Sequence, residues 1–294
     1  MKYGIYYAYW EKQWGGDYLK YAAKVAGLGF DILEISCAGV AEMTARQADE
    51  LFKTANDAGV ALSGNYGPRP SENIASQDPA VVKNALDFWE KTFVNLERLH
   101  IRYVAGALYS YWPVDFSGAI DKAADRERSV AGMKKLAKVA ANYGITLGME
   151  VLNRFEGYLL NTAREAVDYV RDVDEANVNV MLDTFHMNIE EDDISEAIKT
   201  AGRKLGHLHA GEPNRRPPRD GSRLNWREIG AALHEAGYDG TIVMEPFVMS
   251  GGQVGGDIKV WRDLASDTSE AALDREAAKS VAFLRDAIEG ARPR

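Results

Sequence analysis

The segment GITLGMEVLNRFE, residues 144–156, carries the pattern that decides the expected fold. A glycine ends an amphipathic stretch, an apolar run from Thr146 to Leu152 has the character of a strand, and Glu150 stands near the end of that run. The pattern returns in three later segments, VNVMLDTFHMN (178–188), LGHLHAGE (205–212) and GTIVMEPF (240–247). Each of these runs brings one polar residue to the same end of a strand.

Eight strand-like segments alternate with longer amphipathic segments along the chain. The predicted strands are Tyr3–Tyr9, Ile32–Ser36, Ala61–Asn65, Tyr103–Leu108, Thr146–Leu152, Val178–Asp183, Leu205–Ala210 and Thr241–Phe247. Helical spacing is clearest at Val130, Met133, Leu136, Ala137 and Ala140, and at Ala277, Val281, Leu284 and Ile288 before Gly290. Glycines expected to end helices are Gly29, Gly59, Gly144, Gly202 and Gly237. Eight strands alternating with eight helices predict an α/β fold, a (β/α)8 TIM barrel, with residues 1–294 in a single domain.

Four polar residues stand at the tips of consecutive predicted strands: Glu150, Asp183, His209 and Glu245. A buried carboxylate is costly without a partner, and neighbouring strands lie about 4.8 Å apart, so these tips can converge on one ion. Three carboxylates and one imidazole suit Mn²⁺, Mg²⁺ or Co²⁺ better than structural Zn²⁺, which prefers Cys and His. The tips therefore predict one divalent metal. The alternative is that they cap helices or pair with loop arginines.

Glu150 and Glu245 end strands five and eight of the predicted barrel, so they approach the metal from different sides. A substrate chelated between them would present one face to each glutamate. This arrangement suits a two-base proton exchange at carbon, in which one group removes a proton and the other returns one. Metal ligation lowers the basicity of a carboxylate, so the metal must compensate by polarising a ketone and stabilising an enediolate.

Further candidate residues lie in the segments after the strands. Segments 212–225 and 248–269 are expected as long loops at the C-terminal face of the barrel, where active sites of this fold lie. His186 could donate a hydrogen bond to a sugar oxygen, and Glu156 and Arg215 could reach hydroxyl groups above the metal. Aromatic residues near strand ends, which could wall the pocket or simply pack in the core, are Tyr6, Trp14, Trp112 and Phe247.

Several other polar residues are given no chemical role. His207 shares the inward face of its strand with His209 but lies one layer deeper, so a core or supporting position is expected. His100 and His234 fall in predicted helices. Cys37 has no base identifiable near it in the sequence, which argues against a thiol nucleophile. The glycines of GGQVGG, residues 251–256, match neither a dinucleotide fingerprint nor a Walker loop.

Composition limits the function classes. The 294 residues are 46% hydrophobic, enough for a large core, and the net charge of 35 − 44 = −9 disfavours binding to a phosphate backbone. The single cysteine allows no intramolecular disulfide, which fits a reducing compartment. The first 14 residues lack the apolar centre of a signal peptide, and no apolar run approaches the roughly 18 residues of a membrane helix. We expect a cytoplasmic protein with no nucleic-acid or membrane partner.

Five segments together resemble the ketose 3-epimerases. They are YGIYYAYW (3–10), GALYSYWPVDF (106–116), GMEVLNRFE (148–156), VMLDTFHMNIEE (180–191) and VMEPFVMSGGQVGGDIKVW (243–261). The family includes D-tagatose 3-epimerase and D-psicose (D-allulose) 3-epimerase, and the psicose branch looks closer. The resemblance extends over essentially the whole chain. The stretch SGNYGPRPSEN (63–73) is less uniform across the family, so substrate preference is not implied.

The resemblance implies a (β/α)8 barrel, a divalent metal that is usually Mn²⁺ or Co²⁺, and epimerisation at C3 of free ketohexoses. It also implies a homodimer or homotetramer. The implied metal ligands are Glu150, Asp183, His209 and Glu245, and the implied catalytic pair is Glu150 and Glu245. The implied substrate contacts are Glu156, His186 and Arg215, and we count Ala107 in GALYSYWPVDF among the pocket residues.

Three other functions are alternatives to this one. An aldose–ketose isomerase, or another sugar isomerase on the same fold, would move hydrogen between C1 and C2 of a sugar. A metal-dependent DNA-repair endonuclease of related barrel type would need more histidine ligands and a basic face, and five histidines with a charge of −9 argue against it. A non-catalytic sugar-binding protein would have no use for two opposed bases.

Overall fold

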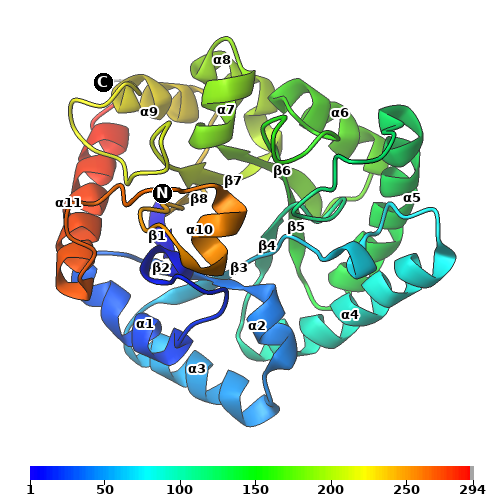
Figure 1. The fold of residues 1–294 in the computed structure, drawn as a ribbon, viewed down its shortest axis with the longest axis horizontal. Coiled ribbons are helices and arrows are strands. Elements are labelled where there is room, and N and C mark those ends of the chain that lie inside the picture. Colours follow the sequence, from blue (N-terminus) through cyan, green and yellow to red (C-terminus); the bar gives the residue numbers. More distant parts are fainter. Residues whose placement is uncertain (292–294) are drawn as a thin grey trace.

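The computed structural model, shown in Figure 1, describes residues 1–291 of the protein. Eight parallel strands pair in chain order and close into a barrel, with β1 bonded to β8. The strands are β1 (Lys2–Tyr6), β2 (Ile32–Ser36), β3 (Ala61–Asn65), β4 (Tyr103–Gly106), β5 (Thr146–Glu150), β6 (Val178–Asp183), β7 (Leu205–Ala210) and β8 (Thr241–Met244). The predicted TIM barrel is confirmed. The last three residues of the expected 1–294 unit lie outside the described residues.

The helices form a ring outside the barrel, except for α10, which lies over the barrel itself (Figure 1). They are α1 (Tyr18–Val25), α2 (Cys37–Glu42), α3 (Ala45–Asp57), α4 (Pro79–Arg98), α5 (Lys122–Ala141), α6 (Ala163–Val173), α7 (Thr184–Glu190), α8 (Ile194–Ala201), α9 (Trp226–Glu235), α10 (Gly252–Ile258) and α11 (Glu270–Glu289). Residues 1–291 thus hold eleven α-helices, not the expected eight, because β2 and β6 are each followed by two helices and β8 is followed by α10 and α11.

Four strands match the sequence expectation residue for residue, and the other four are shorter. β1 ends at Tyr6, where a 3-10 helix over Tyr7–Trp10 begins. β4 ends at Gly106, whose φ of 124° departs from extended geometry. β8 ends at Met244, two residues before a proline that has no N–H to donate to a neighbouring strand. β5 ends at Glu150 rather than at Leu152.

Two further expectations are corrected, and two concerning glycines are confirmed. His100 does not lie in a helix, because α4 ends at Arg98 and His100 adopts a φ of 54°, in the left-handed region. The expected end of the last helix at Gly290 is confirmed, since α11 ends at Glu289. The segment 248–269 is not a plain loop, since it contains α10. The glycines expected after other helices, at positions 29, 59, 144, 202 and 237, all have positive φ.

The interior of the barrel is polar over much of its length. Alternate residues of each strand face inward, and on β7 these are His207 and His209, both 0% exposed. Tyr103 of β4 stacks on the His207 ring at a centroid distance of 5.2 Å. It occupies space that a side chain at Gly148 would fill, since a Cβ there would lie 2.4 Å from the Tyr103 hydroxyl. The apolar core therefore lies mainly between the barrel and the helices, leaving the strand ends free to carry a polar site.

One helix covers the mouth of the barrel. α10 lies over the C-terminal ends of the strands in Figure 1, and Val254 at its start donates to the carbonyl of Lys12 in the loop after β1 at 3.1 Å. Gly252 approaches that carbonyl so closely that a Cβ would lie 2.0 Å from its oxygen. In residues 1–291, no helix combines the length and apolar character required to cross a bilayer.

Candidate active site

The structure brings the four polar tips together at the C-terminal end of the barrel. Glu150 and Asp183 are the last residues of β5 and β6, His209 lies in β7, and Glu245 directly follows β8. One ligand atom from each residue lies within 4.8 Å of those of the other three. The Nδ1 atom of His209 lies 3.9 Å from Glu150 Oε1, 3.9 Å from Asp183 Oδ2 and 3.5 Å from Glu245 Oε2.

These distances fit a shared cation better than a hydrogen-bonded cluster. Nδ1 of His209 is buried and has no hydrogen-bond partner among the described residues. Unpartnered buried polar atoms are costly, and this one faces three carboxylates. Ligand atoms about 2.1 Å from a common ion lie about 3 to 4 Å apart, which matches the spacing found here. The donor set, three carboxylates and one imidazole, favours Mn²⁺, Co²⁺ or Mg²⁺.

The electrostatics of the cluster also favour added positive charge. Burial, together with the neighbouring carboxylates of Glu245 and Asp183, raises the pKa of Glu150 well above its ordinary value. Burial opposes charge on His209, but Glu245 and Glu34 raise the pKa of its imidazole well above its ordinary value. Without a cation both groups therefore bind protons more tightly than usual, and a bound cation would compete with those protons.

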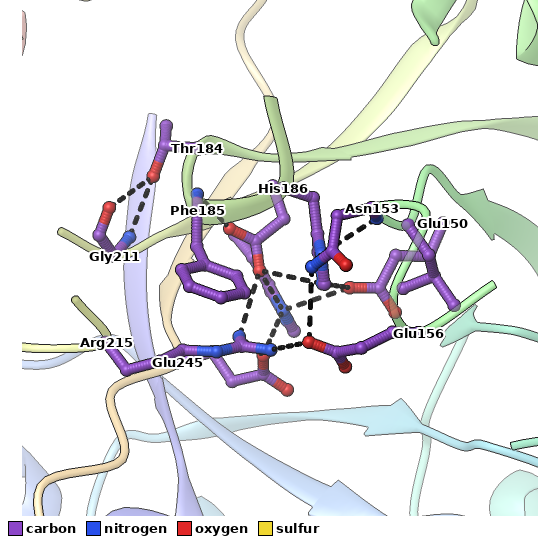
Figure 2. Close-up of polar contacts among 12 residues, drawn as sticks. Glu150, Asn153, Glu156, Thr184, Phe185, His186, Gly211, Arg215 and Glu245 are labelled. Atoms are coloured by element: carbon purple, nitrogen blue, oxygen red, sulfur yellow. Dashed lines mark hydrogen bonds and ion pairs between the residues drawn. The ribbon is translucent and has the colours of Figure 1, made fainter. Parts of the chain in front are cut away.

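His186 is held as a neutral donor that faces the cluster. The backbone N–H of Asn153 donates to Nδ1 of His186 at 3.1 Å, so the ring proton of the neutral imidazole resides on Nε2. Burial lowers the pKa of His186, which favours this neutral form. Nε2 lies 3.9 Å from both Glu150 Oε1 and Asp183 Oδ2. Its N–H can therefore donate to a ligand oxygen held beside the four tips (Figure 2).

Arg215 lies across the cluster from His186. Its guanidinium donates to Glu245 Oε2 at 3.0 Å and to Glu156 Oε1 at 3.1 Å, as Figure 2 shows. The cation also lies 3.7 Å from the centroid of the Phe185 ring. Burial opposes ionisation of Glu156, but Arg215 and then His186 hold the pKa of that carboxyl below its ordinary value. Glu156 is therefore an ionised acceptor for hydroxyl groups.

A short hydrogen-bond pair fixes the loops that carry these residues. The hydroxyl of Thr184 donates to the carbonyl of Gly211 at 2.7 Å and accepts from its N–H at 2.9 Å (Figure 2). Arg215 has a left-handed φ of 64°, and its carbonyl accepts from the N–H of Phe247 at 2.9 Å. The ends of β6, β7 and β8 are thereby tied to one another, which preorganises the site.

One pocket of about 530 Å³ collects the predicted contacts. Its wall includes every residue predicted for substrate, namely Tyr6, Trp14, Ala107, Trp112, Glu156, His186, Arg215 and Phe247. Glu150 and Glu245 also line it, whereas Asp183 and His209 lie deeper, at 1% and 0% exposure. The two glutamates therefore reach the pocket while the other two tips support them from below.

Helix α10 holds the aromatic rings that line one wall of the pocket. The indole N–H of Trp14 donates to Asp257 of α10 at 2.7 Å. Trp14 in turn meets Trp112 and Phe247 edge to face, at centroid distances of 6.0 and 6.3 Å. A helix within the segment expected as a loop thus positions the rings that shield the pocket from water.

Two inward-facing polar residues were not predicted from the sequence. Glu34 of β2 is 0% exposed, and its Oε1 lies 2.6 Å from Nε2 of His209. Asn65, the last residue of β3, lines the pocket at 7% exposure, and its Nδ2 has no hydrogen-bond partner among the described residues. The sequence carried a signal for each, because the carboxylate of Glu34 interrupts the apolar run ILEIS and the amide of Asn65 ends the run ALSGN.

Comparison with known proteins identifies the family. A sequence model of xylose isomerase-like TIM barrels matches residues 22–287. The D-psicose 3-epimerase of Ruminiclostridium cellulolyticum is 52% identical over 98% of this chain and 98% of its own length. The chain belongs to the ketose 3-epimerase family.

Two further comparisons with ketose 3-epimerases give the same assignment. The D-psicose 3-epimerase of Enterocloster bolteae is 51% identical over 97% of this chain and 95% of its own length. A crystal structure of D-psicose 3-epimerase from Clostridium cellulolyticum H10 with D-tagatose matches with a TM-score of 0.96 at 51% identity, covering 98% of this chain and 99% of that one. Membership of this family makes the chain an isomerase of the epimerase class, and the resemblance found in its sequence is confirmed.

Proposed function

We propose that this protein inverts C3 of free ketohexoses, interconverting D-fructose and D-psicose, with D-tagatose and D-sorbose as a second possible pair. The observation that carries the proposal is the pair Glu150 and Glu245, which enter one pocket from β5 and β8. Similarity over the full length to D-psicose 3-epimerases supports the same reaction. Two bases around one carbon are what inversion requires and what simple sugar binding does not.

In the proposed reaction, one of Glu150 and Glu245 removes the C3 proton of the ketose and the other returns a proton to the opposite face. The intermediate is a cis-enediolate, and the configuration at C3 decides which glutamate acts first. Nε2–H of His186 and the guanidinium of Arg215 donate to the sugar oxygens O1 to O3, while Glu156 accepts from a hydroxyl. The aromatic wall of Trp14, Trp112 and Phe247 excludes water from the reacting carbon.

The proposed cofactor is one divalent cation, Mn²⁺ or Co²⁺, with Mg²⁺ as a further possibility, held by Glu150, Asp183, His209 and Glu245. When bound, it would polarise the ketone oxygen and supply several kcal/mol of charge stabilisation. The spacing of these four side chains and the unpartnered Nδ1 of His209 support the assignment. We expect a single-domain, cytoplasmic protein that forms a homodimer or homotetramer. Light scattering on the purified protein would test the oligomeric state.

The test is incubation of metal-loaded protein with D-fructose in D₂O, followed by NMR of the sugars. D-psicose carrying deuterium at C3, absent after EDTA treatment, is the expected result. Deuterium at C1 or C2 together with an aldose product would instead assign the rival aldose–ketose isomerase activity. If D-fructose, D-psicose and D-tagatose all remain free of label, the proposed activity is wrong.

A further inference from the structure

A buried carboxylate lies directly behind the proposed metal ligands. Glu34 sits in the middle of β2, is 0% exposed and faces the barrel interior. Its Oε1 lies 2.6 Å from Nε2 of His209, and its Oε2 accepts from the hydroxyl of Ser63 at 2.9 Å. A carboxylate this deeply buried requires such partners, and nothing in the reaction described above uses it.

The contact of Glu34 with His209 determines what the other imidazole nitrogen can do. A carboxylate only accepts hydrogen bonds, so Nε2 of His209 must carry the proton that bridges to Glu34. When the imidazole is neutral, Nδ1 then has a free lone pair, and it is this nitrogen that faces Glu150, Asp183 and Glu245 at 3.5 to 3.9 Å. The hydrogen bond from Nε2–H of His209 to Glu34 thus selects the tautomer whose Nδ1 can ligate a cation.

We propose that Glu34 is a positioning residue, which holds His209 as the Nε2–H tautomer with Nδ1 directed at the cation. The inference rests on the proposed metal site and goes beyond it, because Glu34 touches neither cation nor sugar. Carboxylates that orient ligating histidines also raise the ligand basicity of the ring, and their loss weakens metal binding. The contribution comes from β2, whereas all four proposed ligands come from β5 to β8.

The environment of Glu34 keeps its carboxylate fixed. His207 lies 3.1 Å from Oε2 through its Nε2, and its own Nδ1 is 2.6 Å from the hydroxyl of Thr241. Tyr103 stacks on the His207 ring at 5.2 Å. Ser63 and His207 therefore contact the carboxylate that orients His209, while Thr241 and Tyr103 hold His207 in place, so the Glu34 carboxylate has little freedom to move.

The same three residues, Glu34, His207 and His209, could instead be considered as a second cation site. The distance of 2.6 Å between Glu34 Oε1 and His209 Nε2 argues against this, since it is a hydrogen-bond length. Two ligand atoms on one ion would lie about 3 Å or more apart. We therefore expect one cation per chain.

The test compares the wild type with Glu34→Gln by calorimetric titration of the purified full chain with Mn²⁺. The expected result is one Mn²⁺ per chain in both proteins, with affinity about 10- to 100-fold weaker in the variant. Glu72→Gln is the matched control, because Glu72 is a second buried carboxylate, 5% exposed, that bonds Tyr66 rather than His209. Its Mn²⁺ affinity should match that of the wild type.

A second readout follows the imidazole itself. With ¹⁵N-labelled histidine and saturating Mg²⁺, the wild type should show His209 as the Nε2–H tautomer, with the Nε2 proton shifted downfield by its hydrogen bond to the Glu34 carboxylate, and in Glu34→Gln this proton should move upfield. The chain has only five histidines, which makes the spectrum assignable. Should Glu34→Gln fail to fold, Ser63→Ala keeps the carboxylate but removes one of its supports, and a smaller loss of Mn²⁺ affinity, about 3-fold to 10-fold, is expected.

The outcomes separate the inference from the proposed function. A wild type that binds no divalent cation overturns both. A wild type that binds one cation and epimerises, together with a Glu34→Gln variant of unchanged affinity and unchanged His209 spectrum, overturns the inference alone. Two cations per wild-type chain, with one lost in Glu34→Gln, would replace the positioning role with a second metal site.

Discussion

Substitution Glu245→Gln separates the two halves of the proposed proton exchange. The amide has nearly the same shape as the carboxylate but cannot act as a base at neutral pH. Arg215 loses an anionic partner at 3.0 Å but keeps Glu156 at 3.1 Å and Asp183 at 3.6 Å. We therefore expect a folded protein whose free energy of unfolding falls by at most about 3 kcal/mol, the value of a hydrogen bond to a charged group.

The expected loss of epimerisation is far larger than the loss of stability. Removal of a general base typically costs 10²- to 10⁴-fold in rate, and inversion in either direction needs both glutamates. We expect kcat to fall by at least about 10³-fold, which corresponds to about 4 kcal/mol. Glu150 remains able to remove a proton from the sugar epimer whose C3–H faces it. Its side chain is 8% exposed and lines the pocket, so its proton can exchange with solvent.

The assay uses D₂O at saturating Mn²⁺ and measures deuterium at C3 of D-fructose and D-psicose separately. Glu245→Gln should label one of the two sugars without forming the other, and Glu150→Gln should label the opposite sugar. Asp183→Asn is the control, since Asp183 is a proposed ligand without a proton-transfer role and its loss should reduce the labelling of both sugars alike. Equal labelling of both sugars in Glu245→Gln, or turnover within tenfold of wild type, would refute the two-base reasoning.

Three further predictions concern pH, backbone and specificity. Because the pKa values of Glu150 and His209 lie above their ordinary values of 4.5 and 6.5 without a cation, protons compete with metal. Mn²⁺ affinity, and hence the rise in Tm on adding Mn²⁺, should therefore increase from pH 5.5 to beyond 6.5, as measured by titration and thermal unfolding; a flat profile would contradict this. Gly106→Ala should lower stability by about 3 kcal/mol or more in thermal unfolding, because Gly106 has a φ of 124° and its Cβ would lie 2.2 Å from a carbonyl oxygen. Gly144→Ala should cost only about 1 kcal/mol, because its φ of 64° is left-handed but its Cβ would meet only Arg102 Nη1, at an ordinary contact distance of 3.7 Å. Asn65→Ala loses no side-chain hydrogen bond to any residue in 1–291 and should leave Tm unchanged, but should raise KM about 3- to 10-fold for at least one of D-fructose, D-psicose and D-tagatose. KM values that match those of the wild type for all three sugars would exclude a role in sugar recognition.

The barrel could be predicted because its strands are short, apolar and bounded by turn signals. The strand over residues 178–183 was located to the residue, since Val178 follows a polar turn and Asp183 ends the apolar run. The strand over residues 103–106 was overestimated, because Ala107 and Leu108 continue the apolar run while the backbone turns at Gly106. Apolar character alone does not reveal where an extended backbone bends.

The grouping of the polar tips could be predicted for a different reason. Glu150, Asp183, His209 and Glu245 occupy equivalent positions on consecutive strands, and a closed barrel places equivalent positions side by side. Glu34 could not be found in this way, because its partner His209 lies 175 residues further along the chain. Their contact also requires that both side chains lie at the same depth inside the barrel. α10 was missed because its glycines weaken any helical signal, and its position depends on docking against the loop after β1.

The location of Glu34 links cation binding to the assembly of the whole barrel. Residues 150–245 contain every proposed ligand, so the second half of the chain alone holds the complete set. The carboxylate that orients His209 arrives only when β2 of the first half docks across the barrel. Tight cation binding therefore requires that both halves of the barrel have joined. A bound ion would therefore stabilise the assembled barrel relative to its separate halves.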